Sequence, residues 1–177
     1  MQTFVNSLKT HVRQSFSMSK QPVSKAVPIE ELSPLLLGLI NDGTDVVFTV
    51  TGNSMRPLWY SHRDSVVLSA CDTDTLKRGQ IPLYKRANGQ YVLHRIIRVK
   101  KDSYDIIGDR QTEIEHDVPK DSVLCVVKAF YRRGEYHTCD ELPFRIYSAV
   151  WLALRPVRGI LFKLNSLRMK ILKGGKK

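Results

Sequence analysis

Hydrophobic and polar residues alternate through the middle of the chain in short runs that end at turn-forming residues. A period of two residues is typical of half-buried β-strands. Asn88-Gly89 is the strongest turn signal, because Asn-Gly suits the tight turn that matches strand twist. Pro82 predicts an edge position or a bulge for its strand. The predicted strands cover residues 46–50, 65–69, 81–85, 91–100, 104–107, 123–131 and 135–138. Residues 45–143 are therefore predicted to form one mainly antiparallel β domain.

The pattern before this domain is helical. Residues 32–40 follow two acidic residues and end at Asn41-Asp42-Gly43, as expected of a short helix. Within residues 1–28 an apolar residue recurs at every fourth position, namely Phe4, Leu8, Val12 and Phe16. This stripe fits a docking helix, and a loosely ordered arm fits it equally well. Residues 1–44 are predicted to form an N-terminal arm and a short helix.

The pattern after the β domain, over residues 144–177, predicts a basic amphipathic helix that Pro156 and Gly159 kink or divide. Its apolar stripe contains Val150, Leu154, Val157, Leu161 and Leu164. Its basic side contains Arg145, Arg155, Lys163, Lys170 and Lys173. Such a helix either lies on an anionic membrane surface, here through residues 144–173, or packs its stripe on the domain. No acidic residue balances the basic side, which favours the membrane.

The charge distribution supports this division of the chain. The net charge is +11, and nine of the Lys and Arg residues lie after residue 144, where there is no Asp or Glu. A basic tail suggests an anionic partner, lipid or nucleic acid. No apolar run is long enough for a membrane span or a secretory signal, so a cytoplasmic or peripheral membrane location is expected. Three scattered cysteines predict neither a disulfide scaffold nor a metal site, and no cofactor is expected.

One short stretch, residues 50–57, places a serine at a break in the β pattern. Gly52 is predicted to relieve crowding in a tight bend, and Pro57 prevents a regular strand from continuing. Ser54 could then point its hydroxyl outward as a nucleophile, with backbone N–H groups nearby for an oxyanion. An ordinary turn serine is the alternative.

Two further signals follow in the chain. His94 interrupts an apolar alternation in what is predicted to be a well-ordered strand, where a base would be held accurately. Gly108-Asp109 lies at the end of the next predicted strand, 104–107. Taken singly, His94 fits a histidine paired inside the sheet and Gly108-Asp109 fits a turn. The three signals occur in a defined order: a Gly-x-Ser-Met-x-Pro turn, then a histidine after a hairpin, then Gly-Asp. This order favours a catalytic set over three unrelated features.

These segments resemble the conserved boxes of type I signal peptidases and of the related LexA-type self-cleaving peptidases. The resemblance covers roughly residues 45–137. The matching segments are Gly52-Asn53-Ser54-Met55-Arg56-Pro57, Leu83-Tyr84-Lys85 with its hairpin, Val92-Leu93-His94-Arg95-Ile96 and Ile107-Gly108-Asp109. It implies a signal-peptidase/LexA-like catalytic β domain. Most bacterial members use a lysine base, whereas some relatives use histidine, and His94 falls on that position.

The resemblance also implies residue roles. Ser54 would be the nucleophile, and neutral His94 would take its proton. The turn formed by Gly52, Asn53 and Ser54 would supply the oxyanion hole, with Met55 and Pro57 beside it as substrate-binding residues. Asp109 would orient His94 or brace the site. Asp117 is the second candidate for that acid, and Lys85 is a rival base that precedes the hairpin.

Several positions depart from the family pattern. Gly52 stands where signal peptidases usually have serine, as in the LexA-type branch. Gln80 replaces an acid at the head of the third strand, and Pro82 disturbs that strand. The N-terminal membrane anchor typical of signal peptidases is not evident. These departures concern the substrate and the membrane topology more than the chemistry.

The leading hypothesis is a serine endopeptidase of the signal-peptidase type that uses a Ser54–His94 dyad. It would cleave a leader or signal segment from a polypeptide, with no nucleic acid as partner. The alternative is a non-catalytic regulatory module whose basic tail binds anionic lipid or nucleic acid.

Overall fold

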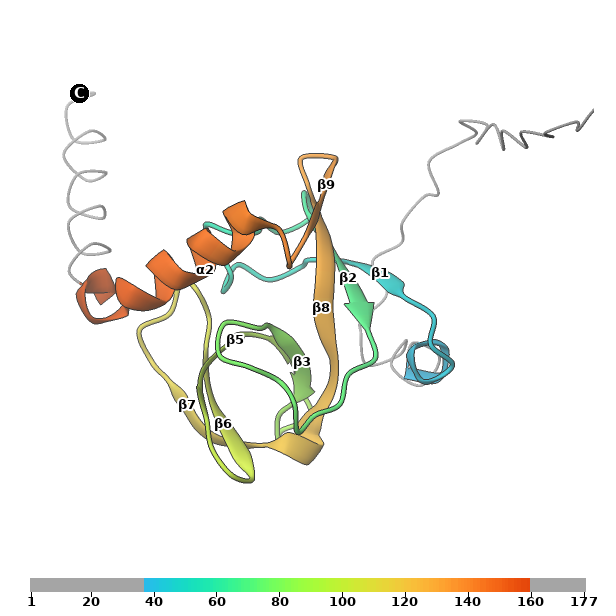
Figure 1. Ribbon diagram of the computed structural model, residues 1–177, viewed down its shortest axis with the longest axis horizontal. Helices are drawn as coiled ribbons and strands as arrows, with labels where there is room; N and C mark the ends of the chain where they lie inside the picture. The colour runs from blue at the N-terminus through green and yellow to red at the C-terminus, as the bar shows by residue number, and fades with distance from the viewer. Residues whose placement is uncertain (1–36, 160–177) are drawn as a thin grey trace, which may run out of the picture.

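A computed structural model describes residues 37–159 of the chain. Its main sheet has the strand order β1-β2-β8-β3-β4, with β9 paired to β8, and every pairing is antiparallel. The long strand β8 runs through the middle (Figure 1). The bounds are Val46–Thr49 for β1, Ser65–Ser69 for β2, Pro82–Lys85 for β3, Tyr91–Leu93 for β4, Val123–Arg132 for β8 and Glu135–Thr138 for β9. The prediction of a mainly antiparallel β fold is confirmed.

Two tight turns form where the sequence predicts them. Gly89 has a φ of 86° in the turn between β3 and β4, and its N–H donates to the Arg86 carbonyl at 2.9 Å. Arg133 and Gly134 have φ values of 54° and 89° in the turn between β8 and β9. In the β8–β9 turn, positive φ at both central positions matches the turn to the strand twist, whereas in the β3–β4 turn Gly89 has positive φ and Asn88 does not.

Pro82 lies in an interior strand, because β3 is paired on both sides, with β8 and with β4. The prediction of an edge position is therefore wrong. The predicted bulge is present: the register between β3 and β8 shifts between Leu83 and Tyr84. Pro82 itself is paired only with Val126 of β8, because the pairing between β3 and β4 begins at Leu83, and this is compatible with a residue that has no N–H to donate.

The predicted strand 91–100 is two strands that belong to different sheets. β4 ends at Leu93, and β5, Arg95–Val99, starts a second sheet with β6, Ser103–Ile107, and β7, Glu115–Pro119. His94 is the residue between the two sheets, so its predicted place inside a strand is wrong. The sequence pattern did not predict β7, because three of its five residues, Glu115, His116 and Asp117, are polar and only Val118 is buried.

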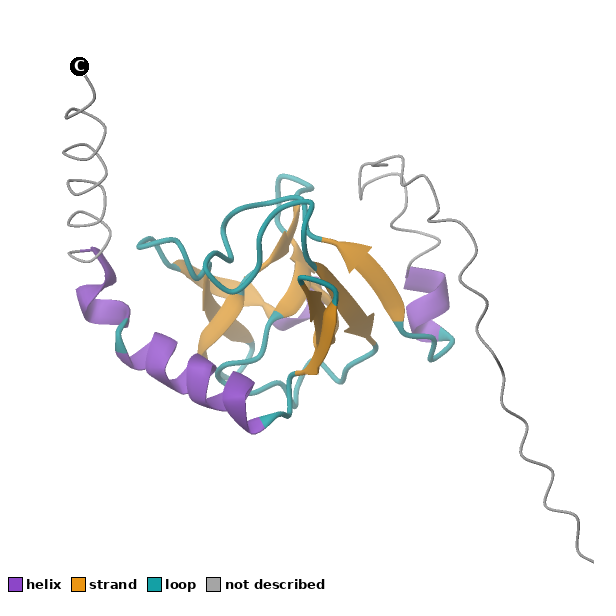
Figure 2. Cartoon of the chain, turned by 90° about the horizontal axis from the view of Figure 1, so that it is seen from above, coloured by secondary structure: helices purple, strands orange, loops and turns teal. Residues whose placement is uncertain are grey.

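The apolar core of residues 37–159 consists of two clusters, and the second joins residues of the second sheet to Tyr84 and Val123 of the main sheet. The first surrounds Trp59 and Phe130, and the second surrounds Tyr84 and Tyr104. A short 3-10 helix, η1 (Lys120–Ser122), joins β7 to β8. Figure 2, which views the molecule from above, shows the strands gathered in one body with the last helix on its outer side.

That helix, α2, spans Leu142–Ala153 and is followed by the 3-10 helix η2, Arg155–Val157. The predicted division near Pro156 is therefore present. Leu161, Leu164 and the predicted stripe before residue 37 lie outside the described residues. Within residues 37–159, no helix is long and apolar enough to cross a membrane.

Candidate active site

Ser54 lies in the loop between β1 and β2, which backbone hydrogen bonds close at its base. The Val50 N–H donates to the Asp64 carbonyl at 2.9 Å, and the His62 N–H donates to the Val50 carbonyl at 2.7 Å. The Ser54 carbonyl accepts a bond of 2.7 Å from the Arg110 N–H. This bond fixes the peptide group of the predicted nucleophile against the segment that follows β6.

The geometry of Gly52 contradicts one prediction. A Cβ built on Gly52 would meet no atom within 4 Å, and the residue is not in the left-handed region. Gly52 therefore does not relieve steric crowding. Its exposed position on the rim of the cavity that contains Ser54 leaves space for a larger side chain.

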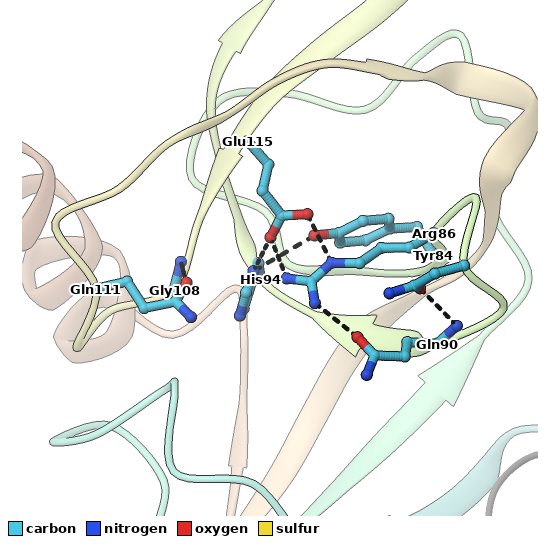
Figure 3. Close-up of polar contacts among 8 residues, drawn as sticks. Tyr84, Arg86, Gln90, His94, Gly108, Gln111 and Glu115 are labelled. Carbon is cyan, nitrogen blue, oxygen red and sulfur yellow. Dashed lines mark hydrogen bonds and ion pairs between the residues drawn. The ribbon is translucent and has the colours of Figure 1, made fainter.

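His94 is almost completely buried, with 1% of its surface exposed. Its Nδ1 lies 2.9 Å from Oε1 of Glu115 and 3.4 Å from the Tyr84 hydroxyl (Figure 3). Because a carboxylate only accepts hydrogen bonds, Nδ1 carries the proton and Nε2 keeps a free lone pair. Burial lowers the pKa of His94, and the charge and hydrogen bond of Glu115 oppose this only in part. His94 is therefore neutral at neutral pH, as a general base must be.

Glu115 is held by Arg86, which follows β3. The guanidinium donates from Nε to Oε2 at 2.8 Å and from Nη2 to Oε1 at 2.6 Å (Figure 3). Burial by itself would raise the pKa of Glu115, but the hydrogen bonds from Arg86 and Tyr84 lower it overall. Burial and the bond to Glu115 raise the pKa of the Tyr84 hydroxyl, so it stays protonated. Glu115 is thus an ionised acceptor for His94.

Gly108 brings the serine and the histidine together. A Cβ built on Gly108 would lie 2.9 Å from the Ser54 carbonyl oxygen and 3.0 Å from His94 Nε2. It would also lie 2.8 Å from Oε1 of Gln111, which accepts a bond of 3.2 Å from the Gly108 N–H. Only a residue without a side chain allows these groups to approach so closely.

Ser54 and His94 line one cavity of about 260 Å³. Most of its other walls are apolar and come from β1, the Ser54 loop, β3 and β4. Among the described residues, no hydrogen bond joins the Ser54 hydroxyl to His94 Nε2. Such bonds often tighten only when substrate binds, so shared access to one cavity is the relevant geometry.

Asp109 forms no hydrogen bond with His94. The partner of Asp109 is Arg95, the residue that follows His94 in the chain. Both side chains are fully buried and form two bonds of 2.8 Å each. Tyr147 of α2 donates to the same carboxylate at 3.3 Å, and Trp151 and Arg158 donate to the Asp109 carbonyl. Of the two roles predicted for Asp109, these contacts match bracing and not orientation of His94.

The other predicted site residues are spread more widely. Asp117 is exposed on β7 and pairs with Lys100 at 2.7 Å. The Lys85 ammonium lies 5.4 Å from the centre of the Tyr91 ring and does not line the cavity. Met55 lines it although the residue is 2% exposed, whereas Asn53 and Pro57 do not.

Sequence reasoning missed Glu115, Arg86 and Gln111. Glu115 begins a strand that the alternation pattern did not reveal, 21 residues after His94. The available signal was local: an acid that starts a polar strand shortly after Gly108-Asp109.

No protein-family model, curated protein or solved structure matches the chain. Within residues 37–159, no group of three or more His, Cys, Asp or Glu residues is arranged to hold a metal ion.

A pair of glycine substitutions tests this geometry. Gly108→Ala should reduce any activity of the site by at least about tenfold, because the new methyl group displaces His94 or the Ser54 backbone. Gly38→Ala is the matched control and should leave the fold and activity nearly unchanged, since its Cβ also meets no atom within 4 Å and Gly38 does not line the cavity. Thermal unfolding and activity of both variants provide the measurement. Equal behaviour of the two variants would contradict the geometry.

A second pair compares the two predicted acids. Asp109→Ala leaves the buried Arg95 without its partner and should lower the free energy of unfolding by about 3–5 kcal/mol. Asp117→Ala removes an exposed carboxylate and should leave the unfolding midpoint in urea nearly unchanged. A small loss in Asp109→Ala would mean that the buried pair does not hold α2 and the loop together.

Proposed function

We propose that the protein is a serine peptidase in which Ser54 is the nucleophile, His94 the base and Glu115 the acid that orients His94. The proposal includes a signal-peptidase/LexA-like fold for the β domain. The observation that carries it is the meeting of the Ser54 backbone and His94 Nε2 at Gly108, while Glu115 holds the opposite ring nitrogen. A serine beside a base that a third group orients is the arrangement that nucleophilic catalysis needs.

In the proposed reaction the Ser54 Oγ attacks the carbonyl carbon of the scissile peptide bond, and its proton passes to His94 Nε2. The resulting imidazolium is stabilised by Glu115, which accepts from Nδ1–H. The imidazolium then gives its proton to the departing amine, leaving an acyl-enzyme on Ser54. Water, deprotonated by His94, releases the acyl group and regenerates the serine.

The backbone N–H of Ser54 is the candidate oxyanion donor. Among residues 37–159 it has no hydrogen-bond acceptor, while the carbonyl of the same residue is tied to Arg110. A preorganised N–H without a protein acceptor can stabilise developing negative charge without first breaking another hydrogen bond.

The walls of the cavity favour an extended polypeptide as substrate. β1 and β4 are the outer strands in the order of the main sheet, and residues of both line the cavity. An extended peptide can pair with an edge strand while apolar pockets receive its alternate side chains. We propose a leader or signal segment with apolar side chains next to the cleaved bond, consistent with the sequence resemblance.

Removal of the nucleophile or the base tests the reaction. Ser54→Ala and His94→Ala should each reduce cleavage by about a thousandfold or more. Ser61→Ala, in the same loop, and His116→Ala, at an exposed position, are the matched controls. New N-termini produced from an unstructured peptide library, detected by mass spectrometry, measure the activity. Full cleavage by folded Ser54→Ala protein would refute the proposal.

The pH profile tests the role of Glu115. Activity requires neutral His94, so it should fall as the pH drops through a pKa below the ordinary value of 6.5. Glu115→Gln removes a negative charge that raises the His94 pKa, so the acidic limb should move to still lower pH. The maximal rate should also fall, because Nδ1 loses its charged acceptor. An acidic limb that moves to higher pH in Glu115→Gln would contradict this role.

A further inference from the structure

Helix α2 has one face that packs on the β domain and an opposite aliphatic face that does not. Phe144, Tyr147, Ser148 and Trp151 are partly or fully buried against the domain. The opposite face carries aliphatic side chains at every fourth position: Leu142, Ile146, Val150 and Leu154, which are 66%, 53%, 50% and 37% exposed. The sequence predicted that an apolar stripe either packs on the domain or meets a membrane. The described part of that stripe, including Val150, Leu154 and Val157, does not pack on the domain.

This aliphatic face lies on the outside of the molecule. Figures 1 and 2, taken at right angles, both show α2 along the outer side of the strands. Single exposed apolar residues are normal, but a row along several helical turns indicates a binding surface. The face contains no aromatic ring, because the aromatic residues of α2 are those of its inner face.

The groove along one side of α2 is mainly positive. This groove, of about 720 Å³, separates α2 from the loop before β3, and its walls include Lys77, Arg78 and Arg145 but only one acid, Asp140. Lys77, Arg78 and Arg145 are all exposed. In the sequence, the stretch from residue 142 to residue 177 contains nine Lys and Arg residues and no Asp or Glu. An exposed aliphatic helix face together with a mainly cationic groove is complementary to a bilayer surface that contains anionic lipids.

We propose that the outer face of α2 and its cationic groove dock the protein on a membrane surface that contains anionic phospholipids. The aliphatic side chains enter the interfacial region, and Lys77, Arg78 and Arg145 meet the phosphate groups. A second copy fits this face less well, because two acid-free basic segments would repel each other. Nucleic acid also fits less well, since aliphatic side chains offer neither hydrogen bonds to phosphate nor rings for bases to stack on.

Docking through α2 would place the candidate active site at a fixed position near the bilayer. The inner face of α2 holds the loop of Gly108 and Asp109 through Tyr147 and Trp151. The docking surface does not depend on the proposed peptidase chemistry, because none of its residues lines the cavity of Ser54 and His94.

Co-sedimentation of the full chain with lipid vesicles tests the docking surface. The probes are phosphatidylcholine vesicles with and without phosphatidylglycerol. Ile146→Ser/Val150→Ser should weaken binding to the anionic vesicles by about tenfold or more, because it removes two aliphatic side chains from the interface. Leu39→Ser/Val99→Ser is the matched control, since these side chains are 40% and 44% exposed elsewhere on the domain, and it should bind normally. Lys77→Gln/Arg78→Gln/Arg145→Gln should weaken the preference for anionic vesicles and reduce the salt dependence of binding.

Three results would overturn the proposal. The first is an absence of binding to anionic vesicles, and the second is equal binding by Ile146→Ser/Val150→Ser and its control. The third is evidence for a different occupant. It would be a dimer in analytical ultracentrifugation, or a nucleic-acid complex, that Ile146→Ser/Val150→Ser abolishes while its binding to vesicles remains. Circular dichroism shows whether each variant is folded. If Ile146→Ser/Val150→Ser does not fold, the charge variant still tests the surface independently. Peptide cleavage in solution should be unchanged in all of them, which separates failure of docking from failure of the peptidase proposal.

Discussion

The buried ion pair of Arg95 and Asp109 is the interaction on which the site depends. Each of its residues is adjacent in the chain to a residue of the site: Arg95 follows His94, and Asp109 follows Gly108. When the two side chains form their two 2.8 Å bonds, they hold the His94 and Gly108 backbones near each other. A buried charge without its partner is costly, so the pair strongly disfavours arrangements in which these segments separate. The same interaction therefore links the second sheet to the geometry of the candidate site.

The electrostatic design around His94 combines opposing effects. Burial favours the neutral ring, while Glu115 would favour the charged one, and the balance lies on the neutral side. Arg86 is essential to this balance because it keeps Glu115 ionised and partly cancels the effect of the carboxylate on His94. A neutral base with an ionised acceptor behind it is ready to take a proton and to stabilise the charge that results. In the proposed peptidase, this arrangement would prepare His94 to act as the base for Ser54.

Helix α2 connects the candidate site to the outer surface. Its inner face donates hydrogen bonds to Asp109 through Tyr147 and Trp151, and its outer face is aliphatic and exposed. An ordinary amphipathic helix would bury its aliphatic side and expose its polar one. Here the inner face is aromatic and hydrogen-bonded, so the aliphatic face remains available for a partner. Anything that binds this face contacts the element that braces the Gly108-Asp109 loop.

The sequence by itself determined the β class of the domain, most strand positions, the turn at Asn88-Gly89 and the prominence of Ser54 and His94. Those features follow from local alternation, from turn chemistry and from an ordered set of short motifs. Only the tertiary structure decided that His94 lies between two sheets, that Glu115 and not Asp109 is its partner, and that the aliphatic face of α2 is exposed. Side-chain pairs such as His94 with Glu115 and Arg95 with Asp109 depend on how distant strands pair and on which charges are buried together. Local sequence patterns do not record those distances, because residues 21 positions apart come together only after both sheets have formed.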